Sequence, residues 1–78
     1  MRTTWYFDEH VLRKRPYLRV EWCEEALRHP AARQLQPDGR WRCWIHVEQL
    51  GKLLRVVTLE DGETVHNAFP DRNFPGVW

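Results

Sequence analysis

The sequence predicts a single α+β domain over residues 1–78, with two N-terminal helices packed on one face of a three- to four-stranded antiparallel meander and a short N-terminal edge strand. Three observations predict this class. Apolar residues recur at helical spacing before Pro30, strand-forming residues dominate after it, and Gly-containing turns punctuate the second half. A chain of 78 residues is near the lower limit for independent folding, and its five Trp, two Tyr and three Phe supply large side chains for a core.

The first segment predicts a strand followed by a short helix. Residues 3–7 (Thr-Thr-Trp-Tyr-Phe) are rich in strand formers and predict the edge strand. Asp8 suits the N-cap of a helix, and Glu9 is favourable in the first turn. This helix is expected to be short, because Pro16 disfavours helical geometry at the residue before it.

A second helix is expected from about Leu18 to His29, where Pro30 ends it. Its apolar residues fall on one stripe, while the glutamates fall on the other side. The stripe consists of Trp22, Cys23, Ala26 and Leu27.

Three turns set the expected register of the strands. Residues 37–39 suit a three-residue loop, Leu50-Gly51 joins the next pair, and Asp61-Gly62 is a two-residue hairpin signal. Directly paired residues share a face of a sheet. Counting outward gives the pairs Leu35–Trp41, Val47–Leu54, Ile45–Val56, Cys43–Thr58, Thr58–Val65, Val56–Asn67 and Leu54–Phe69.

These pairs divide the sheet into two faces. The core face, expected to lie under the helices, collects Leu35, Trp41, Cys43, Ile45, Val47, Leu54, Val56, Thr58, Val65, Asn67 and Phe69. The opposite face collects Gln34, Gln36, Arg40, Arg42, Trp44, His46, Arg55, Val57, Leu59, Thr64, His66 and Ala68. Trp41 is therefore expected to be buried and Trp44 to lie on the helix-free face.

The opposite face carries the main candidate site. Arg42, Trp44, His46, Arg55 and His66 bring cations, titratable groups and an aromatic ring together. One interpretation is a platform for a phosphate-bearing ligand, with arginine for phosphate, Trp44 for base stacking and histidine for proton transfer. Two alternatives stay open: an ordinary outer face with arginine stems lying over Trp44, and a protein interface. Arg55 lies mid-strand and needs an anionic or aromatic partner if it is covered.

Other chemistry is limited. His10, Arg13 and Arg15 could touch a ligand, although a solvated basic helix explains them too. The chain has no Ser and no Gly-rich phosphate loop, which excludes a serine nucleophile and a nucleotide-binding loop. We expect no metal site and no cofactor, because the four His are scattered without ligand spacing. Cys23 and Cys43 are expected to be buried thiols, and a disulfide between them stays open.

Net charge is +1, and the sequence shows neither a long apolar run nor a secretory signal, so we expect a cytoplasmic protein without membrane contact. Ten of the twelve cations are Arg, which suits phosphate and carboxylate ligands.

The order of features resembles a known family. A His opens a short basic helix (His10 to Arg15), and an acidic helix ends at Pro30. Then follow Asp38-Gly39-Arg40, Leu53 to Leu59, and Thr64 to Phe69. This order resembles small bacterial domains of unknown function that look like minimal BrnT toxins of the RelE-like superfamily, over residues 7–74.

The resemblance implies a RelE-like fold, metal-independent RNA cleavage and neutralisation by an antitoxin protein. By position, Arg55 and His66 match the family's working residues best, with Arg42 and Arg72 as helpers. His66 or His46 would move protons, and Arg40, Arg42, Trp44 and Arg72 would bind RNA. The alternative from another class is a non-catalytic protein-interaction module that uses the same face for a protein partner or a homodimer. Whether the chain is an enzyme stays open on the sequence alone.

Overall fold

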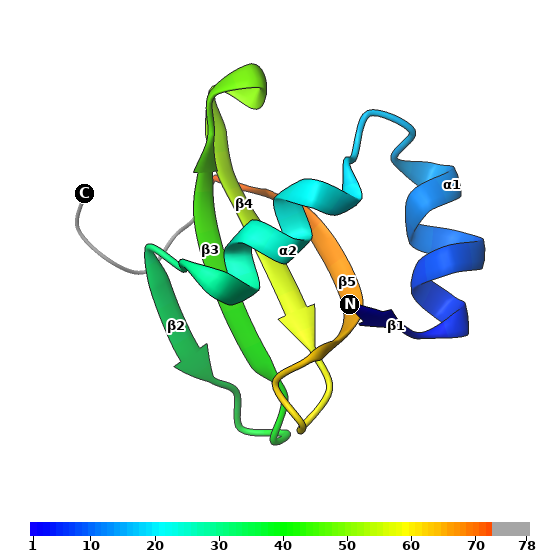
Figure 1. Ribbon diagram of the computed structural model, residues 1–78, viewed down its shortest axis with the longest axis vertical. Helices are drawn as coiled ribbons and strands as arrows, with labels where there is room; N and C mark the ends of the chain where they lie inside the picture. Colours follow the sequence, from blue (N-terminus) through cyan, green and yellow to red (C-terminus); the bar gives the residue numbers. More distant parts are fainter. Residues whose placement is uncertain (73–78) are drawn as a thin grey trace.

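The computed structural model describes residues 1–72, so the expected domain end at residue 78 lies outside the described residues (Figure 1). Two short helical segments precede most of the sheet. The elements in chain order are β1 (Arg2–Thr3), the π-helical turn η1 (Phe7–Val11), α1 (Leu12–Lys14), α2 (Val20–Arg28), β2 (Ala32–Leu35), β3 (Trp41–Val47), the 3-10 turn η2 (Glu48–Leu50), β4 (Lys52–Thr58) and β5 (Thr64–Asp71).

The sheet corrects the predicted fold class. Its order is β1-β5-β4-β3-β2, and β1 pairs parallel to β5, so the sheet is five-stranded and mixed. It is not the RelE-like antiparallel meander of three or four strands that the resemblance implies. Turn signals reveal only strands joined by hairpins, and β1 reaches β5 through a long-range pairing that no turn announces. No helix within residues 1–72 is long and apolar enough to cross a membrane.

The N-terminal helix begins earlier than predicted. The predicted strand over residues 3–7 is cut to Arg2–Thr3, and Trp5 and Tyr6 are already helical. Thr4 caps this helix instead of Asp8: its hydroxyl accepts the Phe7 backbone N–H at 3.1 Å, and its carbonyl accepts the Asp8 N–H at 3.1 Å. A hydroxyl cap of this kind offsets the missing hydrogen bonds of a first turn, and here it overrides the strand preference of the aromatic residues.

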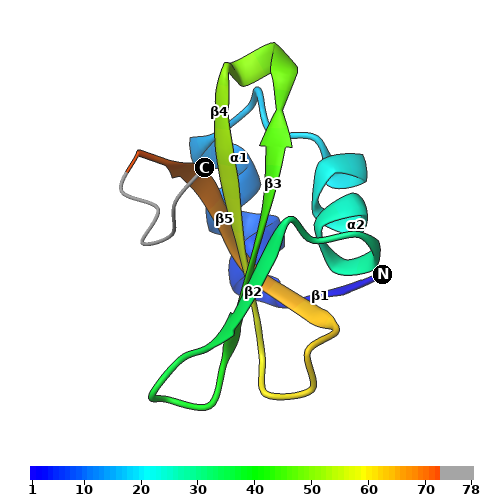
Figure 2. The same ribbon diagram turned by 90° about the vertical axis from the view of Figure 1, so that its left-hand side faces the viewer.

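The second helix agrees with its prediction. α2 spans Val20–Arg28 and ends just before Pro30. Cys23 and Ala26 on its apolar stripe are buried, and Trp22 and Leu27 pack against the same core. In the view of Figure 2, α2 lies on one side of the sheet.

Two of the three turn registers are confirmed, and the third is offset. Leu35 pairs with Trp41 and Thr58 pairs with Val65. At the β3–β4 connection, η2 lengthens the turn, so Val47 pairs with Lys52 instead of Leu54. The offset is two residues, and because strand side chains alternate, each residue keeps its predicted face.

A β-bulge in β5 changes the faces further along the chain. Thr58 pairs with Val65 but Val57 pairs with Asn67, which leaves His66 as the extra residue. The prediction that Asn67 and Phe69 lie on the core face is therefore wrong. Phe69 pairs with Arg55 on the opposite face, and Ala68 is buried in the core instead. A single extra residue reverses the parity of everything that follows it.

The core lies between the sheet and the two helical segments. It consists of Phe7, Val11, Leu18, Cys23, Ala26, Cys43, Ile45, Val47, Leu54, Val56, Val65 and Ala68. Leu35, also predicted to be buried, is 53% exposed on the edge strand β2, and Trp41 is only half-buried. Trp44 lies on the opposite face beside Arg55, as predicted, yet it is only 1% exposed.

Candidate functional site

Arg55, the centre of the predicted site, is held in an ion pair. Its Nη2 lies 2.7 Å and its Nε 2.9 Å from Asp71 Oδ2, and the two side chains are 19% and 5% exposed. The same oxygen accepts the Trp44 indole N–H at 2.8 Å. A buried guanidinium needs such a partner, and the bulge supplies it because it moves Asp71 onto the face of Arg55.

Aromatic contacts complete this unit. The Arg55 Cζ lies 5.4 Å from the ring centre of Trp44 and 5.3 Å from that of Phe69. Arg42 lies 5.7 Å from the Trp44 ring and donates from Nε to Gln34 at 2.9 Å. Trp44 is thus a buried, hydrogen-bonded ring under two guanidinium groups, which does not suit it to stack on a base.

The other predicted residues lie at the two ends of the strands, with Arg40 at one end and His46 and Arg72 at the other. His46 is exposed near the η2 end of β3, opposite Leu53 in the pairing. Arg72 is exposed at the end of β5, and Arg40 is half-buried ahead of β3. The backbone N–H of Arg40 donates to Asp38 and lowers the pKa of that carboxyl below its ordinary value. Leu53 pairs with both His46 and Asp71, so His46 lies two strands from the partner of Arg55, and Arg72 directly follows Asp71.

His66 belongs to a different group of side chains. Its Nδ1 lies 3.0 Å from the Thr4 hydroxyl, and its ring stacks on Tyr6 with centroids 4.9 Å apart. Burial, and after it the positive charge of Arg40, lower the pKa of His66 below its ordinary value. The imidazole is therefore kept neutral at pH 7 more completely than an exposed histidine.

Tyr6 also contacts a second imidazole, and the group reaches the surface. His10 lies 5.4 Å from Tyr6 and 5.1 Å from Trp5 between ring centres, the latter edge to face. Trp5 is 70% exposed, and Tyr6 and His10 are exposed as well. We call Trp5, Tyr6, His10 and His66 the aromatic–imidazole cluster.

Local backbone features produce this cluster. In η1 the Leu12 N–H bonds to the Phe7 carbonyl, a π-type turn that buries Phe7 and Val11. With those two residues directed inward, His10 is left on the exposed side of the turn. His66 is the extra residue of the β5 bulge. Single π-turns and β-bulges are both common at functional sites, where they redirect a side chain.

A basic rim adjoins the cluster. Tyr6, Glu9, His10, Arg13 and Lys14 line a shallow hollow of about 380 Å³. Arg13 is paired with Glu9 at 3.1 Å, one turn apart on the helix. Lys14 adds a second cation to the same wall. The hollow offers rings, imidazole and positive charge at one exposed place.

Both cysteines are free buried thiols, as predicted. Burial first, and the charge of Glu24 second, raise the pKa of Cys23 to about 12. Burial also raises the pKa of Cys43. Neither thiol is suited to nucleophilic chemistry at neutral pH. No group of three or more potential metal ligands occurs among residues 1–72.

Sequence reasoning found His10 and His66 but not their association with Trp5 and Tyr6. The strand expected over residues 3–7 hid it, although Thr4 followed by an acidic Asp8-Glu9 pair is a helix-start signal. Comparisons with family models, curated proteins and solved structures found no match to this chain.

Proposed function

We propose that the chain is an endoribonuclease whose working surface is the aromatic–imidazole cluster. The observation that carries the proposal is the meeting of two imidazoles, His10 and His66, on one exposed Tyr6 ring. Each histidine is presented by an irregular backbone segment, and Trp5 beside them offers an exposed ring on which a base can stack. No metal is required for the reaction described below.

The reaction needs a base and an acid at one phosphodiester. In the tautomer whose Nδ1–H donates to Thr4, His66 keeps a lone pair on Nε2, and its lowered pKa favours this neutral form. That nitrogen takes the ribose 2′-OH proton while the 2′-oxygen bonds to phosphorus. The P–O5′ bond breaks, and His10 protonates the departing 5′-oxygen. The products are a 2′,3′-cyclic phosphate and a 5′-hydroxyl.

The proposal changes the part played by the arginines. Arg55 forms an ion pair with Asp71 and stabilises the opposite face of the sheet. It therefore has no role in binding the RNA phosphate. The Arg13 and Lys14 side chains at the rim of the hollow attract the RNA backbone instead. An antitoxin-type protein that neutralises the activity would cover the cluster.

The test is cleavage of a labelled single-stranded RNA in the presence of EDTA. His66→Gln and His10→Gln should each reduce the rate at least a hundredfold, the usual scale of a lost general base or acid. The wild-type rate should rise with pH through the His66 pKa, which burial and the charge of Arg40 hold below its ordinary value. His46→Gln and His29→Gln are matched controls, since both residues are exposed outside the cluster. Equal rates for all four variants, or intact RNA with the wild type, would overturn the proposal.

A second candidate is the non-catalytic interaction module. It is favoured by the exposure of Trp5, 70%, next to the exposed Tyr6 ring, because such residues are enriched at binding hot spots. Trp5→Ala would then abolish partner binding or homodimer formation while RNA stays whole. Sedimentation of wild type and this variant, beside the cleavage assay, separates the two functions.

A further inference from the structure

A second hollow lies away from the aromatic–imidazole cluster. It is an open groove of about 640 Å³ between α2, β2, the N-terminus and the β4–β5 turn. Figure 2 shows the N-terminus beside α2, at the side of the sheet that the helix covers. Its lining includes the arginines Arg2, Arg28 and Arg33, the carboxylates Glu24, Asp61 and Glu63, and the apolar Leu27.

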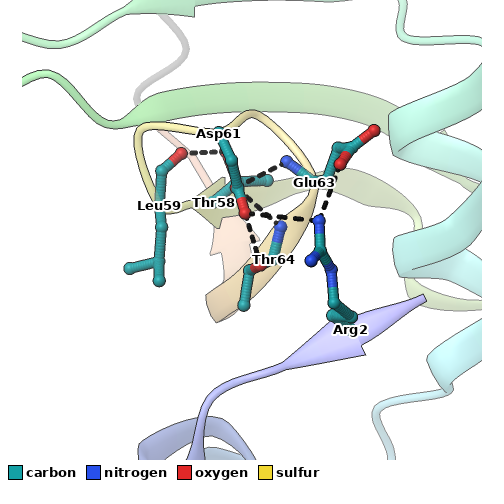
Figure 3. Close-up of polar contacts among 6 residues, drawn as sticks. All are labelled: Arg2, Thr58, Leu59, Asp61, Glu63 and Thr64. Carbon is teal, nitrogen blue, oxygen red and sulfur yellow. Dashed lines mark hydrogen bonds and ion pairs between the residues drawn. The ribbon is translucent and has the colours of Figure 1, made fainter.

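Two of the three carboxylates are already engaged, Asp61 within the turn and Glu63 by Arg2 of β1 (Figure 3). Asp61 Oδ1 accepts the backbone N–H groups of Glu63 and Thr64 at 2.9 Å each, and its Oδ2 accepts the Thr64 hydroxyl at 2.6 Å. These bonds, with that hydroxyl first, lower the pKa of Asp61 to about 2. Glu63 is paired with Arg2 at 2.8 Å.

Arg33 stacks on Trp41, and within residues 1–72 it forms no ion pair. Its Cζ lies 3.9 Å from the ring centre of Trp41, and an added Cβ at Gly62 would lie 2.9 Å from its Nη2. Among residues 1–72 no carboxylate forms an ion pair with Arg33 or with Arg28. Among the charged groups that line the groove, those outside the ion pairs of Arg2 are therefore two arginines, Arg28 and Arg33, and one carboxylate, Glu24.

We propose that this groove binds an extended acidic segment of a protein partner. Carboxylates of the segment pair with Arg28 and with the fixed guanidinium fork of Arg33, a geometry suited to carboxylate. Arg33 belongs to β2, which is an edge strand of the sheet, and no other strand among residues 1–72 covers its outer edge. The backbone of an extended segment pairs with that edge, and every second side chain enters the groove, because strand side chains alternate between the two faces of a sheet.

The lining argues for a peptide and against RNA. Glu24, Asp61 and Glu63 repel a continuous phosphate backbone, whereas separate carboxylates on a peptide can be placed over the two arginines alone. A strand edge also offers backbone N–H and C=O groups in the pattern that a peptide backbone complements. The groove is open, and its volume of about 640 Å³ is far more than a single small anion would fill.

The probe is an end-capped six-residue peptide in which Glu and Thr alternate, titrated calorimetrically into the whole chain at low salt. Arg33→Gln and Arg28→Gln should each weaken binding roughly tenfold, as expected for one lost charge-assisted hydrogen-bonded contact. Arg33→Lys keeps the positive charge but loses the planar guanidinium group. Its affinity for the peptide should therefore lie between those of the wild type and Arg33→Gln. Arg19→Gln is the matched control, an exposed arginine that lines neither hollow. Thermal melting of each variant shows that it is folded.

A second probe tests the strand edge. The same peptide with alternate backbone N-methyl groups should bind roughly tenfold more weakly than the unmodified peptide, because it cannot donate those hydrogen bonds. Equal binding by the Arg33→Gln and Arg19→Gln variants would overturn the proposal, and so would inorganic phosphate binding as tightly as the peptide. RNA cleavage should be the same in Arg33→Gln as in wild type, so failure here is distinct from failure of the proposed nuclease activity.

Discussion

At the scale of single residues, Asp71 is the side chain on which the opposite face of the sheet, the one away from the helices, depends. Its Oδ2 accepts both Trp44 and Arg55, and it is 5% exposed. Asp71→Ala leaves a buried guanidinium and an indole N–H without this acceptor, and should lower the free energy of unfolding by about 3–5 kcal/mol. Denaturant unfolding measures it, with the exposed Glu25→Ala as control.

The double variant separates the ion pair from the packing. Arg55→Ala removes the charge that Asp71 neutralises, so the double variant Arg55→Ala/Asp71→Ala should lose much less stability than the two single losses added together. Additive losses would show that Asp71 acts on the fold by some route other than Arg55.

The same residues show how far the site could be derived from the sequence. The need of Arg55 for an anionic partner followed from its place in an apolar strand, but the partner could not be named. Asp71 reaches that face only because of the bulge at His66, and no local signal in β5 announces the extra residue. The link between His10 and His66 depends on contacts between the two ends of the chain, which spacing does not reveal.

At the scale of elements, connections were predictable where they are local. Gly39, Gly51 and Gly62 all adopt positive φ, as turn glycines should. The register error at η2 was harmless because it was an even number of residues, whereas the odd shift in β5 moved Phe69 out of the core. The parallel pairing of β1 with β5 could not be derived at all, since it depends on how the N-terminal helix packs.

The β4–β5 turn provides the prediction at this scale. Gly62 has φ +70° and a Cβ there would displace Arg33 from Trp41, while Gly51 has φ +62° and open space around it. Both Gly→Ala variants carry the cost of left-handed backbone, about 1–2 kcal/mol. Gly62→Ala should cost an additional ~0.5–1 kcal/mol for the lost cation–π contact. Chemical denaturation of the two variants compares them.

Arg33→Ala removes the guanidinium group that a Cβ at Gly62 would meet, and it serves as the background for both glycine variants. In that background, Gly62→Ala and Gly51→Ala should destabilise the chain equally. A difference that persists without the Arg33 side chain would place its origin in the turn backbone instead.

At the scale of the whole molecule, one small core joins both helical segments to the sheet. Phe7 and Val11 from η1 and Cys23 from α2 meet the inner residues of β3, β4 and β5 in a single cluster. A domain of this size has a free energy of unfolding of roughly 5–15 kcal/mol, and short chains lie toward the lower end. The hydrophobic core therefore has little stability in reserve. The aromatic–imidazole cluster and the groove both depend on this core for their geometry.

This dependence can be tested at β3, whose residues alternate between the two faces. Ile45 is buried in the core, and Ile45→Ala should cost about 2–5 kcal/mol through lost transfer energy and the cavity it leaves. Arg42 is half-buried on the opposite face and donates to Gln34. Arg42→Ala should therefore lower the free energy of unfolding by only about 1 kcal/mol. Thermal and denaturant unfolding of both variants measures the difference. If the two variants unfold together, the core does not lie on the Ile45 side of the sheet. The positions of the cluster and of the groove, both derived from that arrangement, would then have to be given up with it.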